Sequence, residues 1–157
     1  MSVSARLKQF LDEKSVKYVT VSHSRAYTAQ EVAASLHVPG RELAKSVVVH
    51  ADGGFALGVL PAPRRIDFGL LKKAIGAKEL RLATEAEFQS LFPDCETGAM
   101  PPFGNLYGLK VWADDSLKED AEIVFNAGTH TDTVKMSYKD FERVVAPTVT
   151  KFAERSA

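Results

Sequence analysis

Apolar residues at the start of the chain recur first with a helical spacing and then with a strand-like spacing. Val3, Leu7, Phe10 and Leu11 repeat at intervals of three or four residues, which predicts an amphipathic helix of about three turns. Residues 18–22 (YVTVS) alternate apolar and polar side chains, as expected of a half-buried strand. The pattern therefore predicts a helix followed by a strand.

Further helices are indicated by residues that begin or end helices. Residues 28–31 (TAQE) and 84–87 (TEAE) have the form of a capping box, in which Thr and Glu side chains satisfy backbone N–H groups. The first of these helices ends at residues 39–40 (PG). Residues 67–76 start with a capping Asp and end with Gly, and residues 137–140 (SYKD) start a late helix.

Short apolar runs bounded by turn residues predict the strands. Residues 46–50 and 55–60 are separated by Asp-Gly-Gly at 52–54, so we expect a β-hairpin. Three later runs also read as strands, namely residues 109–113, 122–127 and 133–136.

The order of these elements indicates the fold class. The short helices are interspersed among strands without a regular strand–helix–strand alternation, which argues against a doubly wound parallel fold. We expect an α+β fold: a single domain over residues 1–157, with a mixed, mostly antiparallel sheet or partly closed barrel and flanking short helices.

Composition agrees with one globular domain, because 157 residues with 45% hydrophobic content can bury a single core. The formal net charge is zero, but residues 1–75 carry 11 Lys and Arg against 6 Asp and Glu, and residues 76–157 carry 9 against 14. This asymmetry fits either a basic face for a phosphate-rich partner or a chance division of solvated charges. No signal peptide or membrane-spanning run is recognisable, so we expect a cytoplasmic protein.

Lys45 is an unusual residue for its position, because it opens an otherwise apolar strand. Strand alternation puts Lys45 on one face with Val47 and Val49, and Ser46 on the other, which argues against a Ser46–Lys45 nucleophile–base pair. A cation on an apolar face needs a partner, a cavity or an exit to solvent. Lys45 is therefore either a functional residue or a side chain that extends from a strand end to water.

Residues 97–104 (TGAMPPFG) form the second unusual feature. Two glycines enclose two consecutive prolines, and Thr97 is the only polar side chain. Proline fixes φ and lacks an N–H donor, so this segment is neither a helix interior nor a central strand. We expect a rigid apolar loop.

Histidine and cysteine residues give weaker signals. His23, His50 and His130 with Asp132 have side chains that suit zinc, but no recognised ligand spacing, so ordinary polar roles are preferred. Cys95, the single cysteine, excludes an internal disulfide and a cysteine-based zinc cluster. No nucleophile signature surrounds it, and a small buried or half-exposed cysteine is the better interpretation.

A basic cluster and an acidic run can both be explained as solvated surface residues. Arg64, Arg65, Lys72 and Lys73 form a basic cluster that fits either phosphate contacts or a solvated surface. Residues 114–120 contain four carboxylates but lack the ligand spacing and central glycine of an EF-hand loop, so we expect a solvated turn.

Taken together, five segments resemble the YbaK/ProX-type aminoacyl-tRNA deacylases, trans-editing relatives of the insertion domain of bacterial prolyl-tRNA synthetase. The segments follow in family order over most of the chain, and they are SHSRAYTAQEVAASLHV, LAKSVVVH, ALGVLPAPRRIDFGLLKKAIG, TGAMPPFG and VFNAGTHTDTVKMSYKDFERVV. Each segment alone is a weak signal, whereas five segments in the same order as in the family are a specific one.

The resemblance implies a catalytic role for Lys45, and the family's Gly-x-x-x-Pro loop falls on Gly98 and Pro102, with Gly98 facing the lysine across a small pocket. It implies substrate-binding positions at His23, Thr28, Ala99, Met100, Pro101, Pro102, Phe103, Gly128 and His130. The basic cluster Arg64, Arg65, Lys72 and Lys73 would then contact tRNA. The loop departs from the simplest family pattern in its second proline, Pro101.

The implied reaction is hydrolysis of the ester that joins a wrong amino acid to the 3′-terminal adenosine of a tRNA, without a metal ion or organic cofactor. The implied substrate is a mischarged tRNA that carries a small amino acid such as Ala or Cys, with tRNA for proline as the first candidate. Prolyl-tRNA synthetase and an elongation factor are the candidate protein partners. The alternatives are a non-catalytic tRNA- or nucleic-acid-binding module of the same fold, and a regulatory protein that binds a small acyl or amino-acid ligand.

Overall fold

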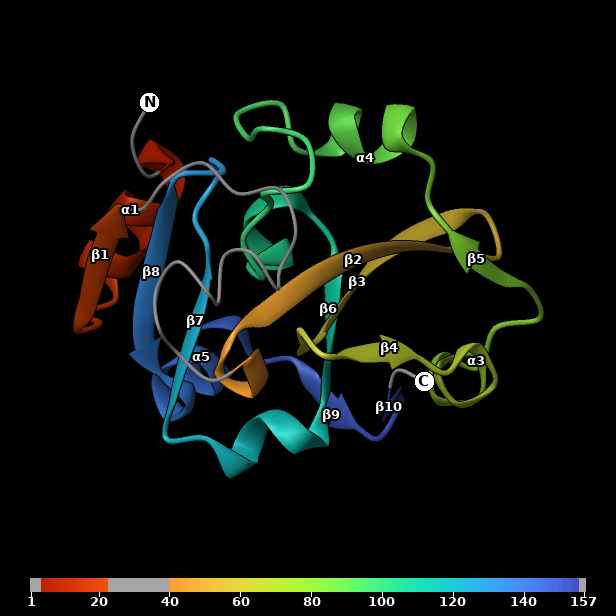
Figure 1. Ribbon diagram of the computed structural model, residues 1–157. Coiled ribbons are helices and arrows are strands. Elements are labelled where there is room, and N and C mark those ends of the chain that lie inside the picture. Colours follow the sequence, from red (N-terminus) through yellow and green to blue (C-terminus); the bar gives the residue numbers. More distant parts are fainter. Residues whose placement is uncertain (1–3, 23–39, 156–157) are drawn as a thin grey trace.

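Figure 1 shows the fold of the computed structural model, which describes residues 4–22 and 40–155. The helix predicted to follow residues 28–31, together with His23 and Thr28, lies outside the described residues. The opening helix and strand are confirmed as α1 (Ala5–Glu13) and β1 (Tyr18–Ser22).

The described strands form three sheets. One is an antiparallel sheet in the order β1-β8-β7, where β7 spans Glu122–Asn126 and β8 spans Asp132–Ser137. A second, small sheet pairs β4 (Arg64–Ile66) with β10 (Ala153–Arg155), antiparallel to each other.

The largest sheet contains the predicted hairpin. β2 (Ala44–Ala51) and β3 (Gly54–Pro61) are antiparallel and joined by a two-residue turn, which confirms the prediction from the Asp-Gly-Gly run. Three more strands complete the order β5-β2-β3-β6-β9, and they are β5 (Leu80–Leu82), β6 (Lys110–Asp114) and β9 (Thr148–Thr150). β6 runs parallel to both β3 and β9, so the sheet is mixed.

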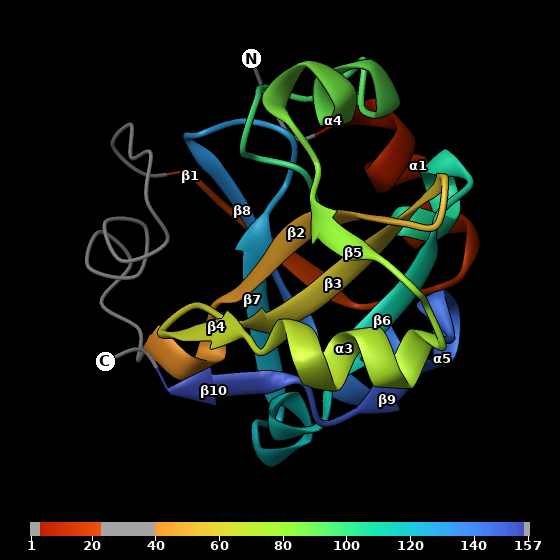
Figure 2. The same cartoon turned by 90° about the vertical axis from the view of Figure 1, so that its right-hand side faces the viewer.

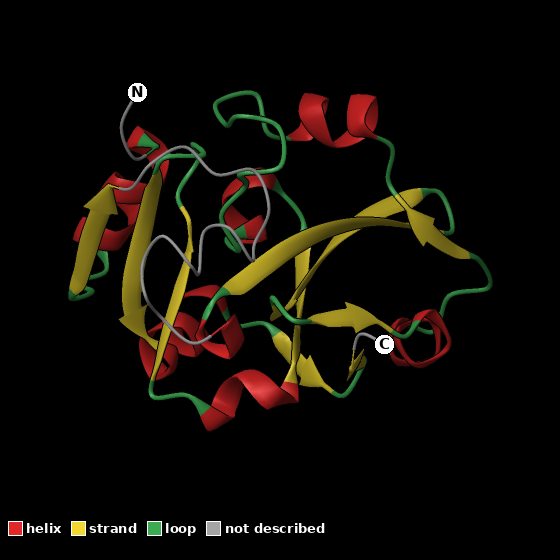
Figure 3. Cartoon of the chain, in the orientation of Figure 1, coloured by secondary structure: helices red, strands yellow, loops and turns green. Residues whose placement is uncertain are grey.

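The helices lie around these strands, as Figure 3 shows. α3 (Phe68–Ile75) begins where the Asp67 carboxylate accepts a hydrogen bond from Leu70 N, and ends at Gly76 in the left-handed conformation. The predicted starts of α4 (Glu85–Leu91), with its complete capping box, and of α5 (Tyr138–Val145), capped by Ser137, are also confirmed. Among the described residues, three short 3₁₀ helices, η1 (Gly40–Glu42), η2 (Gly104–Tyr107) and η3 (Asp115–Glu119), each precede a strand. The α+β prediction with mixed sheets and flanking helices is confirmed.

Both faces of the β2–β3 hairpin are buried, because it separates two apolar clusters. Val48 and Leu57 belong to the larger cluster, which the antiparallel sheet, α1 and α5 complete. Val49 and Leu60 belong to the smaller one, which includes Leu71 of α3. A parallel bridge between Leu43 and Val124 brings the start of β2 to the antiparallel sheet. This bridge places the start of β2 beside the middle of β7.

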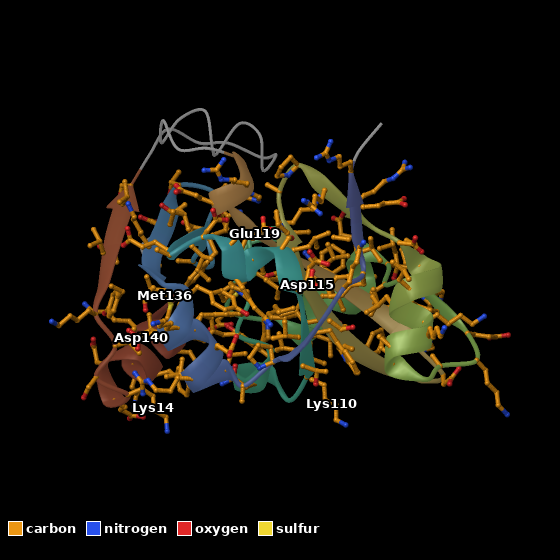
Figure 4. All side chains as sticks on the ribbon, turned by 90° about the horizontal axis from the view of Figure 1, so that it is seen from below. Lys14, Lys110, Asp115, Glu119, Met136 and Asp140 are labelled. Atoms are coloured by element: carbon orange, nitrogen blue, oxygen red, sulfur yellow. The ribbon has the colours of Figure 1, made fainter. Side chains whose placement is uncertain are left out.

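The acidic run at residues 114–120 differs from the predicted solvated turn. Asp115 and Glu119, labelled in Figure 4, are exposed on η3, but Asp114 and Asp120 are only 1% and 8% exposed. Asp114 accepts hydrogen bonds from the backbone N–H groups of Ser116, Phe152 and Ala153. A buried carboxylate can persist there because the chain returns to it with donors.

Candidate active site

A small cavity of about 170 Å³ lies where the start of β2, the end of β7 and the loop that contains Gly98 meet. Its lining residues are Leu43, Ala44, Lys45, Ser46, Gly98, Met100 and Asn126. The structure thus brings Lys45 and Gly98, 53 positions apart in the numbering, to one cavity. The bridge between Leu43 and Val124 accounts for the approach of β2 to β7.

Lys45 is half-buried at this cavity, and its burial lowers the pKa of its ammonium below the ordinary value. Within residues 4–22 and 40–155, no carboxylate forms an ion pair with it. An incompletely hydrated, unpaired ammonium attracts an anionic or partly anionic oxygen more strongly than an exposed one does.

Two polar side chains of the cavity add hydrogen-bonding capacity. Ser46 Oγ and Asn126 Oδ1 are buried, and no hydrogen-bond partner for either lies in the part of the chain that the structure describes. Buried polar atoms without partners are rare, and they are expected where a ligand or water supplies the missing bond. Ser46 lines the cavity beside Lys45, although no hydrogen bond joins them. Asn126 was not predicted as a site residue, because its sequence context indicates only a polar residue at a strand end.

The loop of residues 97–103 is held on the cavity by backbone hydrogen bonds to the turn after β7. Gly128 N donates to Ala99 O at 2.9 Å, and Glu96 N donates to Gly128 O at 2.7 Å. Gly98 has φ +86°, a left-handed conformation that side chains rarely adopt. Because a Cβ at Gly98 would approach nothing closer than 3.6 Å, its backbone conformation, rather than lack of space, selects glycine there.

His130 connects the turn to the loop from within the protein, with 5% of its surface exposed. Its Nε2 lies 2.7 Å from Thr97 O, and its backbone N donates to Glu96 Oε1 at 2.7 Å. Asp132 orders the same turn, because it accepts hydrogen bonds from Thr129 Oγ1 and Ser22 Oγ at 2.7 and 2.9 Å. Burial alone would raise the pKa of the Asp132 carboxyl, but these hydrogen bonds outweigh it and lower the pKa.

Other predicted site residues of the loop support its shape rather than line the cavity. Ala99, Pro101 and Pro102 are buried. Phe103 is fully buried in the core, edge-on to Phe10 with ring centroids 5.9 Å apart. These aromatic contacts anchor the loop in the core, and the substrate-binding role that the resemblance implies for Phe103 stays a prediction.

The predicted basic cluster divides between two places. Arg64 and Arg65 lie on β4, and Arg65 forms an ion pair with Glu154 at 2.8 Å. Lys72 and Lys73 lie in the last turn of α3. Lys72 borders a hollow of about 420 Å³ that also includes His50 and Arg81. None of these four residues lines the cavity at Gly98.

Cys95 does not have the environment of a nucleophile. Burial is the main cause that raises the pKa of its thiol to about 11, assisted by the nearby Asp94 carboxylate and opposed by a contact with Tyr107. Its Sγ lies 3.4 Å from Tyr107 Oη, which donates to Asp94 at 2.8 Å. This group ties the segment before the loop to η2.

Among the described residues, no three His, Cys, Asp or Glu side chains come together in a way that would hold a metal ion. In the same part of the chain, no helix has both the length and the apolar character needed to cross a membrane.

The chain matches the family model of the aminoacyl-tRNA editing domain over residues 23–144. It is 30% identical over 152 residues to the multifunctional Ser/Thr-tRNA deacylase ProXp-y of Escherichia coli K12, covering 94% of this chain and 90% of that protein. It is 26% identical over 142 residues to the prolyl-tRNA editing protein ProX of Acetoanaerobium sticklandii, covering 86% and 85%.

Solved structures share the fold. The hypothetical protein APE2540 superposes with a TM-score of 0.87 at 20% identity, covering 95% of this chain and 99% of that chain. A candidate trans-editing enzyme for prolyl tRNA synthetase gives a TM-score of 0.82 at 24% identity, covering 96% of both chains.

Proposed function

This chain belongs to the aminoacyl-tRNA editing domain family, whose members are ester hydrolases of aminoacyl-tRNA, and from that premise we propose its substrate and its site. The proposed substrate is a tRNA mischarged with a small amino acid such as Ala or Cys, with tRNA for proline as the first candidate. The protein would act in trans, with prolyl-tRNA synthetase or an elongation factor as candidate partners.

The observation that carries this proposal is the shared cavity of Lys45 and Gly98. An aminoacyl ester is already activated, so catalysis needs mainly a positioned water and a counter-charge for the developing oxyanion. The Lys45 ammonium would hold the ester by its carbonyl or by the terminal phosphate. Backbone groups at Gly98 would align the water, because glycine permits close approach.

The proposed reaction needs no covalent enzyme intermediate. Water attacks the carbonyl carbon, the bond between that carbon and the ribose oxygen breaks, and the ribose oxygen takes a proton. The products are the free amino acid and a tRNA with a free 3′ end. The neighbouring ribose hydroxyl can assist proton transfer, so the substrate supplies part of the catalysis.

Selectivity would come from the size of the cavity. A volume of about 170 Å³ accepts a small side chain and restricts a large one. Size alone is a limited filter, since one methylene is worth about 1–3 kcal/mol in a hydrophobic pocket.

A second substrate class, the hydroxy amino acids Ser and Thr, is favoured by Ser46 Oγ and Asn126 Oδ1. A substrate hydroxyl would supply the hydrogen bonds that these buried atoms lack in the described part of the chain. The similarity to a protein named as a Ser/Thr-tRNA deacylase supports testing both classes.

The deciding experiment measures release of labelled amino acid from Ala-, Cys-, Ser- and Thr-charged tRNAs, including tRNA for proline. Wild type should release at least one of them, and Lys45→Ala should lower the rate by about 100-fold or more. Lys110→Ala is the matched control, because Lys110 is exposed at the start of β6 and points away from the body of the protein in Figure 4.

The outcomes separate the proposals. Unchanged hydrolysis by Lys45→Ala would contradict the proposed catalytic role of this residue. Tight tRNA binding without hydrolysis of any charged tRNA would favour a non-catalytic binding module. Faster release of Ser or Thr than of Ala or Cys would assign the second substrate class.

A further inference from the structure

A second hollow adjoins the candidate active site and shares Lys45 with it. Its volume is about 300 Å³, and we call it the apolar shelf. Its lining residues are Lys45, Val47, Leu60, Arg65, Ile66, Phe68 and Leu82. They come from β2, β3, β4, α3 and β5, the elements that face the viewer in Figure 2.

The shelf exposes large apolar side chains that folding would ordinarily bury. Phe68 and Leu82 are 37% and 54% exposed. They border one hollow, so they form a continuous apolar surface rather than scattered exposed residues. Such a surface beside a catalytic site is a typical place for the apolar part of a ligand.

The shape of an aminoacyl-tRNA end relates this shelf to the cavity at Gly98. The ester joins an amino acid on one side to a ribose, a base and a phosphate on the other. If the amino acid occupies the cavity of about 170 Å³, the ribose and base must lie outside it, on the surface next to its opening. The apolar shelf is a hollow that Lys45 borders in addition to that cavity.

The charges at the shelf suit a nucleotide. Lys45 and Arg65 are cationic, and within the described residues no carboxylate lines the hollow. Glu154, which pairs with Arg65 at 2.8 Å, is the acidic group beside it. An exposed pair of this kind is weak, so a phosphate can compete with Glu154 for the Arg65 guanidinium.

We propose that the apolar shelf binds the 3′-terminal nucleoside of the tRNA. Its base would lie against the Phe68 ring and Leu82, and the phosphate attached to its 5′ oxygen would lie near Arg65. This inference rests on the proposed deacylase function. Phe68 and Leu82 contribute affinity in this arrangement, and Lys45 lies between the base and the amino acid. A base that stacks on an aromatic side chain contributes in a way that does not depend on the attached amino acid.

The kinetic test uses two variants, each with a matched control. Phe68→Ala should raise KM for a mischarged tRNA by about 5- to 150-fold with little change in kcat, the range expected for loss of one stacking contact. Leu70→Ala is its control, because Leu70 lies on the same helix, is 39% exposed and does not border the shelf. It should leave KM within about twofold of wild type.

A second variant tests the shelf even if the Phe68→Ala protein does not fold. Leu82→Glu adds a negative charge at an exposed position, where it should repel the nucleotide and raise KM by about tenfold. Val19→Glu, at a residue that is 58% exposed on β1, is the control for added charge. Equal KM values for the shelf variants and their controls would overturn the proposal.

A binding measurement separates the shelf from the deacylase function itself. Adenosine 5′-monophosphate should shift the NMR signals of Phe68 and Leu82, whereas ribose 5-phosphate, which has no base, should not. Shifts at the shelf in a protein that hydrolyses no charged tRNA would support the nucleoside site and reject the proposed function. No shift in the wild type, or an unchanged Leu82 shift in Phe68→Ala, would reject the nucleoside site.

Discussion

His130 Nε2 lies 2.7 Å from the carbonyl oxygen of Thr97, the residue before Gly98. A carbonyl oxygen only accepts hydrogen bonds, so Nε2 carries a hydrogen and donates it. The histidine therefore contributes to the position of the cavity wall from behind, through the backbone of the loop.

Replacement of His130 should loosen this wall. His130→Ala removes the donor to Thr97 O, and a hydrogen bond of this kind contributes about 0.5–1.5 kcal/mol, so kcat/KM should fall by about 2- to 13-fold. His130→Gln retains an N–H donor and should recover part of the loss. Steady-state deacylation by the two variants is the measurement, and equal activities would contradict a role for the donor.

Gly98→Ala should reduce both stability and activity. Gly98 has φ +86°, and a non-glycine residue in this region is strained by about 1–3 kcal/mol. Gly76 is the matched control, because it has φ +78° at the end of α3 and no atom within 4 Å of a built Cβ. Urea unfolding should show similar losses for Gly98→Ala and Gly76→Ala, while only Gly98→Ala lowers kcat/KM. Equal kcat/KM values for the two variants would contradict a role for Gly98 in the active site.

Lys45 should give a pH dependence that an exposed lysine does not. Burial lowers the pKa of its ammonium below the ordinary value of 10.5. If the ammonium acts on the ester, enzymatic deacylation, corrected for spontaneous hydrolysis, should fall as pH rises through this lowered pKa. Loss of activity only near the pKa of a free lysine would contradict this prediction.

The same shift has a consequence for stability. Between the lowered pKa and 10.5, the unfolded chain binds more protons than the folded one, so the free energy of unfolding rises with pH across that window. Below the window the ammonium is charged in both states and its burial destabilises the fold. Lys45→Met removes the titrating group, and urea unfolding across this range should show a smaller rise than wild type.

Local signals in the sequence predicted much of this fold. Asp67, Thr84 and Ser137 each cap a helix as expected, because a cap depends on residues within one turn. β4, β5, β9 and β10 were not predicted, since each has three residues, too few to show a period. The parallel pairing of β6 with β3 and β9 depends on partners distant in sequence.

The candidate site was predictable where a residue type was unusual for its place. Lys45 on an apolar strand and Gly98 in a proline loop attracted attention for that reason, and the structure places both at one cavity. Asn126 gave no such signal, because it reaches the cavity only through the tertiary bridge between Leu43 and Val124. Phe103 is fully buried, and its sequence context did not show this, since an apolar residue in a loop can contact the core as well as a ligand.

Cys95 should react slowly with alkylating reagents. Its thiol has a pKa of about 11 instead of 9.0, so its thiolate fraction near neutral pH is about 100-fold lower than that of an ordinary thiol. Iodoacetamide labelling should therefore be at least that much slower than for a free thiol, and it should accelerate with pH up to about 11. Rapid labelling at neutral pH would contradict this environment. Cys95→Ala should retain deacylation.

Asp114→Ala should destabilise the protein more than a neighbouring substitution. The Asp114 carboxylate accepts from Phe152 N and Ala153 N at 2.9 and 2.8 Å, and from Ser116 N at 3.1 Å. Without it, these buried N–H groups lose their acceptor, and each unsatisfied group costs about 1–3 kcal/mol. Urea unfolding should show a total loss of about 3 kcal/mol or more.

Two control variants distinguish loss of the hydrogen-bond acceptor from the effect of any substitution in this segment. Asp114→Asn retains one acceptor oxygen and should lose less, and Asp115→Ala, at an exposed neighbour, should stay within about 0.5 kcal/mol. Ala153 is the first residue of β10, which pairs with β4. Loss of the acceptor for Phe152 N and Ala153 N should therefore also make the position of the shelf residue Arg65 on β4 less fixed. If Asp114→Ala proved as stable as Asp115→Ala, the buried carboxylate would not hold the carboxyl-terminal segment.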